Sequence, residues 1–424
     1  MTMKEPNLAA FLSSFNTDIK ESVGGSITKN YIITPESILK NQFMTTVQNT
    51  LTAFSRPIGE TFLMMEDDLI GKYLQNAKSE DAPLLPFYSE GEFHFRDKTY
   101  KKLLLCPLLM DFSQTDKQIQ KLYYQFQKED KITPYVEDTI SGMQYYYEKS
   151  PYHLFEFYPF IGIHTPAHDL EFIKELLSKY VNITHTFHEP QTVPEKPFYG
   201  IKIYPPLGFN PWPSDNEEMK KVRYIYDFCS MYDIPIISHC DDQGFRGVPA
   251  REAWAYTSPA TWRTVLENYP NLILDFAHVG KQYSPNLENA LSTMQYKIKK
   301  WPTSEWFYLI MELMHDFPNI YTDISFTGTL SEFYFEFGNY YNAQDEEFKE
   351  KLKNHMLFGS DFSVNLLKTE SYSSYYHKVE ASSFSDDLIE SMSSINPIAF
   401  LGLQEPKLED KGQKNSFLDW FFKN

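Results

Sequence analysis

Two stretches of sequence decide the fold, Gly200-Ile-Lys-Ile-Tyr-Pro-Pro and Ile234-Pro-Ile-Ile-Ser-His-Cys. Each is a short apolar run that carries a polar residue near its end, and the amphipathic segment 216–232 lies between them. Short apolar runs separated by a helical segment are typical of βαβ units, whose parallel strands are buried on both faces. This part of the chain therefore predicts two parallel strands joined by a helix.

The same alternation continues on both sides of these stretches. Seven apolar runs lie at 103–111, 155–163, 199–204, 234–239, 272–279, 320–324 and 356–361. Helix-like segments between them lie at 169–180, 216–232, 261–269, 306–316 and 345–354. Seven strands and one earlier strand would close a (β/α)8 barrel. We therefore predict an α/β fold with a distorted (β/α)8 TIM-type barrel over residues 102–403.

The ends of the chain are expected to decorate this barrel. We predict that residues 1–101 form an N-terminal helical extension that also contributes the first strand, for which Lys29-Asn-Tyr-Ile-Ile-Thr is the candidate. Helical periodicity predicts helices at 36–51, after Pro35, and at 60–76, whereas the polar segment 79–99 resembles a loop or an insertion. Residues 404–424 are expected to form a C-terminal tail.

The composition argues for a globular, cytoplasmic protein without nucleic-acid or membrane partners. The 424 residues carry 57 acidic and 39 basic side chains, a formal net charge of −18 that disfavours binding to phosphate-rich surfaces. Cys106, Cys229 and Cys240 form no CxxC pair and predict no disulfide framework. No apolar run approaches the roughly 20 residues of a membrane span, and no secretory signal pattern is recognised.

Polar residues end almost every predicted strand. Functional side chains of a parallel barrel project from the carboxyl ends of its strands, so these residues are expected to meet at one mouth. A single buried histidine is more often a hydrogen-bonded core residue than a ligand, but a series of polar, metal-competent strand ends favours a functional site. The series, in chain order, is Asp111, His164, Lys202, His239, His278, Asp323 and Asp361.

These segments resemble the metal-dependent amidohydrolase superfamily, in the branch that includes aminocarboxymuconate-semialdehyde decarboxylase. The resemblance extends over about 102–403 and rests on short motifs that follow one another in the family's order. The motifs are Pro107-Leu-Leu-Met-Asp-Phe, Gly200-Ile-Lys-Ile-Tyr-Pro-Pro-Leu-Gly-Phe, Ile234-Pro-Ile-Ile-Ser-His-Cys, Ser258-Pro-Ala-Thr-Trp with Tyr269-Pro-Asn-Leu, Phe276-Ala-His-Val-Gly, Asn319-Ile-Tyr-Thr-Asp-Ile-Ser, Leu357-Phe-Gly-Ser-Asp-Phe and Asn396-Pro-Ile-Ala-Phe-Leu-Gly-Leu.

The resemblance implies a divalent metal, expected to be zinc, and roles at the matching positions. His239 resembles a metal-binding histidine, and His278 resembles the histidine that binds a second metal or polarises the attacked group. Asp361 resembles the aspartate that binds metal and takes a proton from the attacking water. Lys202 matches a position where some relatives carry a carboxylated lysine bridging two metals, and without that bridge it would contact an anionic substrate. The implied metal ligands are thus His239, His278 and Asp361, and the implied catalytic residues are Asp361, His278 and Lys202.

One feature of the resembled family is missing. Its first strand ends in a His-x-His pair that binds the catalytic metal, whereas no two of the 11 histidines here are separated by one residue. A catalytic zinc usually takes three protein ligands and a water. His239 and Asp361 would supply two of them. The candidates for the third are His278, Lys202, Glu36 and His164.

Two functions from different classes remain open. The first is an amidohydrolase-like, metal-dependent hydrolase of C–N or C–O bonds in a small molecule, or a decarboxylase, with a reduced metal site. The second is a catalytically inactive barrel that binds a small molecule or a protein partner. The polar strand ends favour the enzyme, and the missing histidine pair favours the binding module. Lys202, Arg246 and Arg251 near the expected mouth suggest a carboxylate ligand, and a homo-oligomer stays open.

Overall fold

Parallel strands pair in the order in which they occur along the chain. The computed structural model describes residues 56–72, 86–113, 132–242, 244–282 and 304–403. Six strands form one sheet in the order β11-β10-β9-β8-β7-β6, β4 pairs with β5, and every pair in these two sheets is parallel. The strands are β4 (Leu103–Leu105), β5 (Phe155–Phe157), β6 (Phe160–Gly162), β7 (Gly200–Ile203), β8 (Ile236–Ser238), β9 (Leu274–Phe276), β10 (Ile320–Asp323) and β11 (Met356–Leu357).

β5 and β6 occupy one strand position of the barrel. Leu103 pairs with Phe155, and a parallel bridge joins Leu108 to Phe160 further along the same two segments. With β5 and β6 counted as one, the strands from β4 to β11 supply seven successive positions in the described ranges. The predicted α/β class with a parallel, barrel-type sheet is confirmed. The candidate first strand at 29–34, the helix expected at 36–51 and the tail at 404–424 lie outside the described residues.

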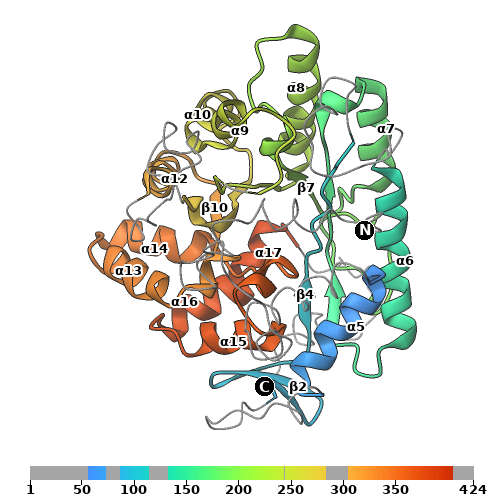
Figure 1. Ribbon diagram of the computed structural model, residues 1–424, viewed down its shortest axis with the longest axis vertical. Helices are drawn as coiled ribbons and strands as arrows, with labels where there is room; N and C mark the ends of the chain where they lie inside the picture. Colours follow the sequence, from blue (N-terminus) through green and yellow to red (C-terminus); the bar gives the residue numbers. More distant parts are fainter. Residues whose placement is uncertain (1–55, 73–85, 114–131, 243, 283–303, 404–424) are drawn as a thin grey trace, which may run out of the picture.

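Helices cover the outside of the strands (Figure 1). Two of them begin at side-chain N-caps that the sequence provides: Asp215 accepts a hydrogen bond from Glu218 N, and Ser304 accepts one from Phe307 N. No helix within the described ranges is both long and apolar enough to cross a bilayer. The helices are α6 (Thr133–Lys149), α7 (Leu170–Tyr180), α8 (Asn216–Tyr232), α9 (Ala250–Thr257), α10 (Pro259–Asn268), α12 (Glu305–Asp316), α13 (Ser331–Asn342), α14 (Glu346–His355), α15 (Tyr372–Glu380), α16 (Asp386–Glu390) and α17 (Asn396–Phe400).

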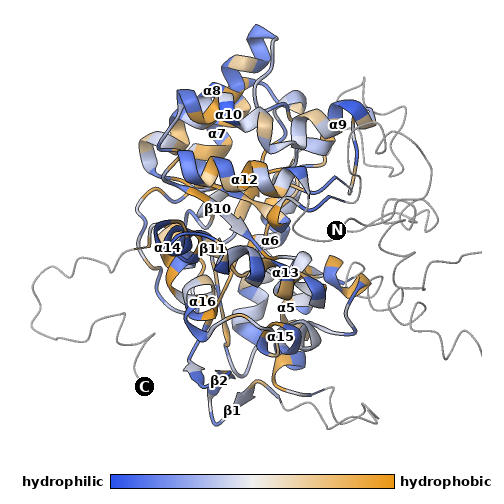
Figure 2. Cartoon of the chain, turned by 90° about the vertical axis from the view of Figure 1, so that its left-hand side faces the viewer, coloured by the Kyte–Doolittle hydropathy of each residue, from blue (hydrophilic) through white to orange (hydrophobic). Residues whose placement is uncertain are grey.

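Alternation along each strand builds two apolar layers. In β8, Ile236 packs into the large core between strands and helices, whereas Ile237 packs into a smaller core inside the barrel. The helices contribute only their inward faces; α14, for example, buries Leu352 and half-buries Phe348, and its remaining positions are hydrophilic (Figure 2). The inner core, which makes the interior of the barrel apolar, consists of Tyr158, Phe160, Phe187, Tyr199, Ile237, Ala277, Tyr321, Leu357, Phe400, Leu401 and Leu403.

The segment expected to be a loop or an insertion at 79–99 is not a loop over its second half. β1 (Tyr88–Ser89), β2 (Glu92–Phe95) and β3 (Lys98–Tyr100) form a three-stranded antiparallel sheet. Phe93 and Phe95 alternate inward and are buried, and this aromatic burial holds strands whose other positions are charged or polar. The high charge of the segment concealed the alternation.

A buried carboxylate ties helix α5 (Ile58–Leu69) to the barrel. Glu66 is 1% exposed and accepts hydrogen bonds from Tyr146 Oη, from Ser150 Oγ at 2.6 Å and from Leu154 N at 2.9 Å. These donors lie in α6 and in the segment that leads into β5. One side chain of the N-terminal region therefore completes the hydrogen bonding of two other elements.

Glu66→Ala is expected to lower the free energy of unfolding by about 3 kcal/mol or more, because three buried donors lose their acceptor at once. Chemical denaturation followed by far-ultraviolet circular dichroism measures the change. Glu60→Ala, on a half-exposed position of the same helix, is the matched control and is expected to change stability by less than about 0.5 kcal/mol. Equal effects of the two substitutions would show that the Glu66 contacts contribute nothing specific.

Candidate metal and anion site

The four residues singled out from the sequence line one cavity of about 490 Å³. Lys202 lies in β7, His239 directly follows β8, and His278 and Asp361 lie in the segments that follow β9 and β11. Parallel strands direct their carboxyl ends to the same end of a barrel, which brings residues far apart in sequence together. The cavity also has an apolar part, which includes Phe160, Ile237, Ala277 and Leu357.

Two histidine rings face one another in this cavity. His278 Nε2 lies 3.2 Å from His239 Nδ1. The other nitrogen of His278, Nδ1, lies 3.0 Å from Ser325 O and 2.9 Å from Ser325 Oγ. A backbone carbonyl can only accept, so this contact assigns the proton to Nδ1 and leaves the lone pair of Nε2 directed at His239.

This geometry fits two ligands of one divalent cation. Two metal–nitrogen bonds of about 2.0–2.1 Å with an ordinary angle between them hold the nitrogen atoms roughly 3 Å apart. The tie from His278 Nδ1 to a carbonyl is the contact that orients metal-binding histidines. In the described ranges, however, no group of three or more His, Cys, Asp or Glu side chains is arranged to hold a metal ion. The histidines thus fit a cation as a pair, without a preformed third ligand beside them.

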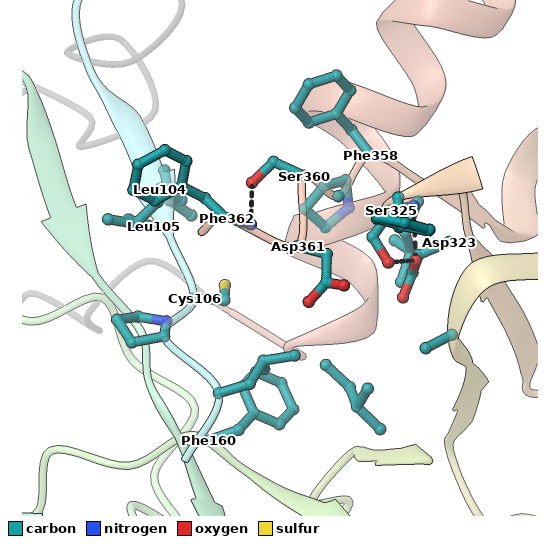
Figure 3. A pocket seen from close by; sticks show the side chains of 18 of the residues that line it. Leu104, Leu105, Cys106, Phe160, Asp323, Ser325, Phe358, Ser360, Asp361 and Phe362 are labelled. Atoms are coloured by element: carbon teal, nitrogen blue, oxygen red, sulfur yellow. Dashed lines mark hydrogen bonds between the residues drawn. The ribbon is translucent and has the colours of Figure 1, made fainter. Parts of the chain in front are cut away.

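Asp361 is a carboxylate that lines the same cavity as this pair. Its backbone has a φ of 55°, a left-handed conformation that aspartate tolerates better than most residues. The side chain points into the open space between Cys106 and Asp323 (Figure 3). Burial raises the pKa of Asp361 above its ordinary value, although the neighbouring His278 and the positive charge of Lys202 oppose the shift.

Lys202 presents a buried positive charge to the same cavity. The residue is 5% exposed, and in the described part of the chain its ammonium makes no hydrogen bond or ion pair. Burial lowers the pKa of Lys202, and the nearby carboxylates, chiefly Asp323 and Asp361, offset this only in part. A buried cation that has no hydrogen bond or ion pair within the described ranges is a natural site for an anionic group of a ligand.

The other basic residues expected near the mouth do not line this cavity. Arg246 donates a hydrogen bond from Nη2 to Asp242 O at 3.0 Å, and Arg251 is exposed at the start of α9. His164, one candidate for a third metal ligand, is also absent from the described lining. Burial lowers the pKa of His164 to about 4, and its backbone N–H donates to Asp111 at the end of a neighbouring segment.

Asp111 belongs to a separate buried cluster. His168 Nε2 lies 2.7 Å from Asp111 Oδ2, and Ser113 N donates to the other carboxylate oxygen at 3.0 Å. Burial alone would raise the pKa of Asp111, but the hydrogen bond and charge of His168 outweigh it, and the pKa lies below its ordinary value. These contacts hold the end of the β4 segment against the 3-10 turn that follows β6. Glu36, the remaining candidate ligand, lies outside the described residues.

The backbone at His278 is strained and is held by its neighbours. His278 and Val279 have φ values of 65° and 54°, and a β-branched residue rarely adopts this conformation. Asp323 Oδ1 accepts a hydrogen bond from His278 N at 3.2 Å, and Thr327 Oγ1 donates to His278 O at 2.8 Å. Sequence reasoning missed Ser325 and Thr327, for which the only signal was their position just after the end of β10.

His239 is positioned by an aromatic ring and a glycine. Tyr204 stacks on the imidazole with ring centroids 4.3 Å apart and an interplanar angle of 26°. Tyr204 Oη accepts a hydrogen bond from Phe245 N at 3.1 Å. Gly244 permits this approach, because its φ is 98° and a Cβ there would lie 2.2 Å from Tyr204 Oη.

Gly244→Ala is expected to weaken metal binding by about tenfold, because the added Cβ displaces Tyr204 and with it the ring of His239. Tenfold is the lower end of the affinity loss seen when the groups that orient a metal ligand are changed. Titration with Mn²⁺, followed by the electron paramagnetic resonance of the free ion, measures the affinity. Gly91→Ala is the matched control, because Gly91 has a similar φ of 88° but a Cβ there would have nothing within 4 Å. If both alanine variants bind Mn²⁺ equally, the contact with Tyr204 has no part in orienting His239.

The structure is a parallel barrel that places imidazole, carboxylate and ammonium groups at successive strand ends. This arrangement is the one expected of the amidohydrolase-type barrel that the sequence motifs resemble. The family comparison agrees with this assignment. Residues 191–403 match the family described as amidohydrolase, and the chain belongs to this family. The match covers β7 to β11 and includes all four residues of the candidate site. A search of curated proteins finds no match.

Several solved structures are similar to the chain. A 5-carboxyvanillate decarboxylase from Novosphingobium aromaticivorans, complexed with manganese and 4-hydroxy-3-methoxy-5-nitrobenzoic acid, has 13% identity and a TM-score of 0.40, over 82% of this chain and 93% of its own. A probable 2-pyrone-4,6-dicarboxylic acid hydrolase from Acinetobacter baumannii, with citric acid bound, has 13% identity and a TM-score of 0.39, over 71% and 100%. A dihydroxybenzoic acid decarboxylase from Polaromonas sp. JS666, with manganese and 2-nitroresorcinol, has 15% identity and a TM-score of 0.36, over 64% and 76%.

Proposed function

We propose that the chain is a metal-dependent hydrolase or decarboxylase that acts on a small organic carboxylate. One observation carries the proposal: His278 Nε2 and His239 Nδ1 lie 3.2 Å apart, with the outer nitrogen of His278 tied to Ser325. Without a cation, this approach requires one ring to donate to the other. With a cation, both lone pairs have the same partner, and the chain's membership of the amidohydrolase family supports that arrangement.

Each residue of the site has a role that its environment supports. His239 and His278 would hold the cation, and Asp361 would approach it as a third ligand or remain beside it. A bound divalent cation supplies a Lewis acid that polarises a carbonyl or carboxylate oxygen. Asp361, whose carboxylate has no hydrogen bond in the described part of the chain, would act as general base toward an attacking water in hydrolysis.

The substrate class follows from Lys202 and the apolar wall. The Lys202 ammonium, which has no hydrogen bond or ion pair to the residues that the structure describes, favours a carboxylate group on the substrate. Phe160, Ile237 and Leu357 favour an apolar body attached to that group. A cavity of about 490 Å³ lies within the usual range of small-molecule sites, roughly 300–1,000 Å³. The structure therefore supports a ligand of the size and chemistry of a substituted benzoate.

The second candidate function is a binding module without catalysis. It is favoured by one observation, the absence of a three-ligand group in the ranges that the structure describes. In this alternative, Lys202 and the apolar wall still bind a carboxylate, and the histidine pair is a hydrogen-bonded remnant of a metal site.

Metal analysis separates the two functions. Protein purified without chelator is expected to contain about one divalent cation per chain, and the apoprotein is expected to regain it from either Mn²⁺ or Zn²⁺, of which zinc was the expectation from the family resemblance. The proposed enzyme should also hydrolyse or decarboxylate small carboxylates only when the cation is present. Benzoate binding with no cation bound under any loading condition would establish the binding module instead.

Metal affinity is expected to fall in acid. Asp361 binds a cation only as the carboxylate, and its pKa lies above the ordinary value, so protonation begins to compete at a higher pH than for an exposed aspartate. The histidines bind a cation only in the neutral form, so protons compete with the cation for them as well. Mn²⁺ titrations between neutral and mildly acidic pH measure the loss. An affinity that is constant over that interval would contradict coordination by these groups.

A further inference from the structure

Two ionisable side chains lie on the inner wall of the barrel, one on either side of an isoleucine. Lys202 pairs in register with Ile237, and Ile237 pairs with Asp275, so the three residues form one row across β7, β8 and β9. Leu274 and Phe276, the neighbours of Asp275 along β9, pack into the core between strands and helices. Because side chains alternate along a strand, Asp275 points to the interior, where it lines the same cavity as Lys202 and Ile237.

Asp275 is a buried polar group whose hydrogen-bonding capacity is unused. The residue is completely buried, and neither of its carboxyl oxygens has a hydrogen-bond partner among the residues that the structure describes. Buried polar groups of folded proteins are almost always hydrogen-bonded, because an unsatisfied group loses the hydration that it has in water. A ligand in the cavity can replace that hydration. The burial and the position of Asp275 therefore favour a ligand that offers a hydrogen-bond donor at this point of the wall.

Lys202 presents the complementary group at the other end of the row. Its ammonium can only donate, and a carboxylate can only accept. Neighbouring strands lie about 4.8 Å apart, so two strand spacings separate the backbones of Lys202 and Asp275 by roughly 10 Å. Ile237 supplies the apolar wall between them. An apolar body can thus lie against Ile237 while polar groups at its two ends reach Lys202 and Asp275.

Asp275 is distinct from the other acids of the cavity. Asp323 Oδ1 already accepts hydrogen bonds from His278 N at 3.2 Å and from Ser325 N at 2.8 Å. Asp361 is the carboxylate that the proposed function assigns to the cation and to the attacking water. Among the acids that line the cavity in the described ranges, Asp275 is the one with two fully buried oxygens that lack a partner. It is therefore the acceptor that remains for the body of the substrate.

We propose that Asp275 is a specificity-determining residue that accepts a hydrogen bond from a hydroxyl or amino group of the substrate, at the end opposite the carboxylate bound by Lys202. The carboxylate end of this assignment rests on the proposed function, whereas the acceptor at Asp275 rests on its own burial and position. The substrate is then an apolar ring or chain with a carboxylate at one end and a donor at the other. On a benzoate, a donor in the meta or para position meets this spacing, and a donor in the ortho position lies beside the carboxylate.

Matched pairs of ligands test the proposal on wild-type protein from which a chelator has removed cations. Isothermal calorimetry compares meta- and para-hydroxybenzoate with meta- and para-methylbenzoate, which have a similar shape but no donor. At least one hydroxyl compound is expected to bind about tenfold more tightly than its methyl partner, the contribution of one hydrogen bond to a buried polar group. Ortho-hydroxybenzoate is the ligand control and should gain nothing over ortho-methylbenzoate, because its hydroxyl lies beside its own carboxylate. No gain for the meta and para compounds, or an equal gain for the ortho compound, overturns the proposal.

Asp275→Leu assigns the preference to this residue. Leucine has the branched shape of aspartate without its acceptors, so the variant is expected to bind hydroxyl and methyl compounds equally. Asp275→Asn retains one acceptor oxygen and is expected to keep most of the preference. If the preference persists in Asp275→Leu, the acceptor lies elsewhere and the proposal is overturned.

The stability of Asp275→Leu is a second readout. The variant should be at least as stable to denaturant as the wild type, because an apolar side chain replaces a buried group that has no partner in the described part of the chain. A variant that is much less stable or does not fold would show that Asp275 has a structural partner, and this result also overturns the proposal.

Failure of this inference differs from failure of the proposed function. The calorimetry uses protein without a cation, whereas metal analysis and turnover test the function. A protein that takes up no cation but prefers the hydroxyl compounds keeps the acceptor at Asp275 and loses the catalytic function. A protein that takes up a cation and acts on benzoates without a hydroxyl preference keeps the function and loses the acceptor. If none of the compounds binds to the cation-free protein, the inference is overturned whatever the metal content.

Discussion

His239→Ala is expected to lower Mn²⁺ affinity by more than about 100-fold, because changes to residues that only support a ligand already cost about 10–100-fold. The reason is the small number of ligands at this site. Two imidazole nitrogens lie at ligand spacing, and the described ranges hold no group of three metal-binding side chains to compensate for the loss of one. Any cation-dependent activity should disappear with the affinity.

His315→Ala is the control for this substitution. His315 lies at the end of α12 with its side chain 76% exposed, and it is not among the residues that line the cavity. Asp361→Asn extends the comparison, since it preserves shape and removes the charge that the cation and the general-base role require. Full metal content and turnover in both His239→Ala and Asp361→Asn would place the chemistry elsewhere in the chain.

Lys202→Met is expected to have opposite effects on binding and stability. Binding of benzoate should weaken by about 2–5 kcal/mol, the usual loss when one member of a buried charge pair is truncated, which is a factor of roughly 30 or more. The free energy of unfolding should increase, because an apolar side chain takes the place of a buried ammonium that makes no hydrogen bond or ion pair in the described ranges. The stability change follows from the lowered pKa of Lys202, because a buried base with a lowered pKa is destabilised in its charged form by folding.

Lys102→Met supplies the contrasting control. Lys102 is also largely buried, but its ammonium lies 3.9 Å from Glu156 Oε1 and donates to His153 O. Removing it leaves a buried carboxylate without its cation, so this variant should be less stable than the wild type. Isothermal calorimetry with benzoate and denaturant unfolding, measured on both variants, give the two quantities. If Lys202→Met binds benzoate with wild-type affinity, Lys202 does not bind the carboxylate group of the ligand.

Lys202 should also make the affinity for benzoate depend on pH in the alkaline range. Only the protonated form of Lys202 attracts a carboxylate, and its pKa in the empty site lies below the ordinary value. Bound carboxylate raises that pKa again, so binding takes up protons in the interval between the two values. Benzoate affinity should therefore decrease as pH rises through this interval, and calorimetry in buffers of different ionisation heat measures the proton uptake.

Local patterns in the sequence were sufficient for many elements of the barrel and for the list of candidate residues, although not for the strands β1, β2 and β3. The helix expected at 216–232 is α8 (Asn216–Tyr232), and the apolar runs at 199–204, 234–239 and 320–324 contain β7, β8 and β10. Apolar residues are stable in water only when they are buried, so their spacing along the chain has to match the period of the element that buries them. The spacing therefore indicates locally whether a segment is a strand or a helix. The polar strand ends were visible for the same reason, as interruptions in those runs.

Only the tertiary structure decided which of these residues meet and how. His164 and His239 both end apolar runs, yet the first packs beside Asp111 and the second faces His278. Asp275 interrupts its strand no more conspicuously than other polar residues, and only the folded barrel shows that it is buried and lines the cavity. Contacts of this kind depend on strand register, on the direction of each side chain and on the donors that adjacent strands supply. Those quantities are set by pairing between distant segments, which no local pattern of the sequence contains.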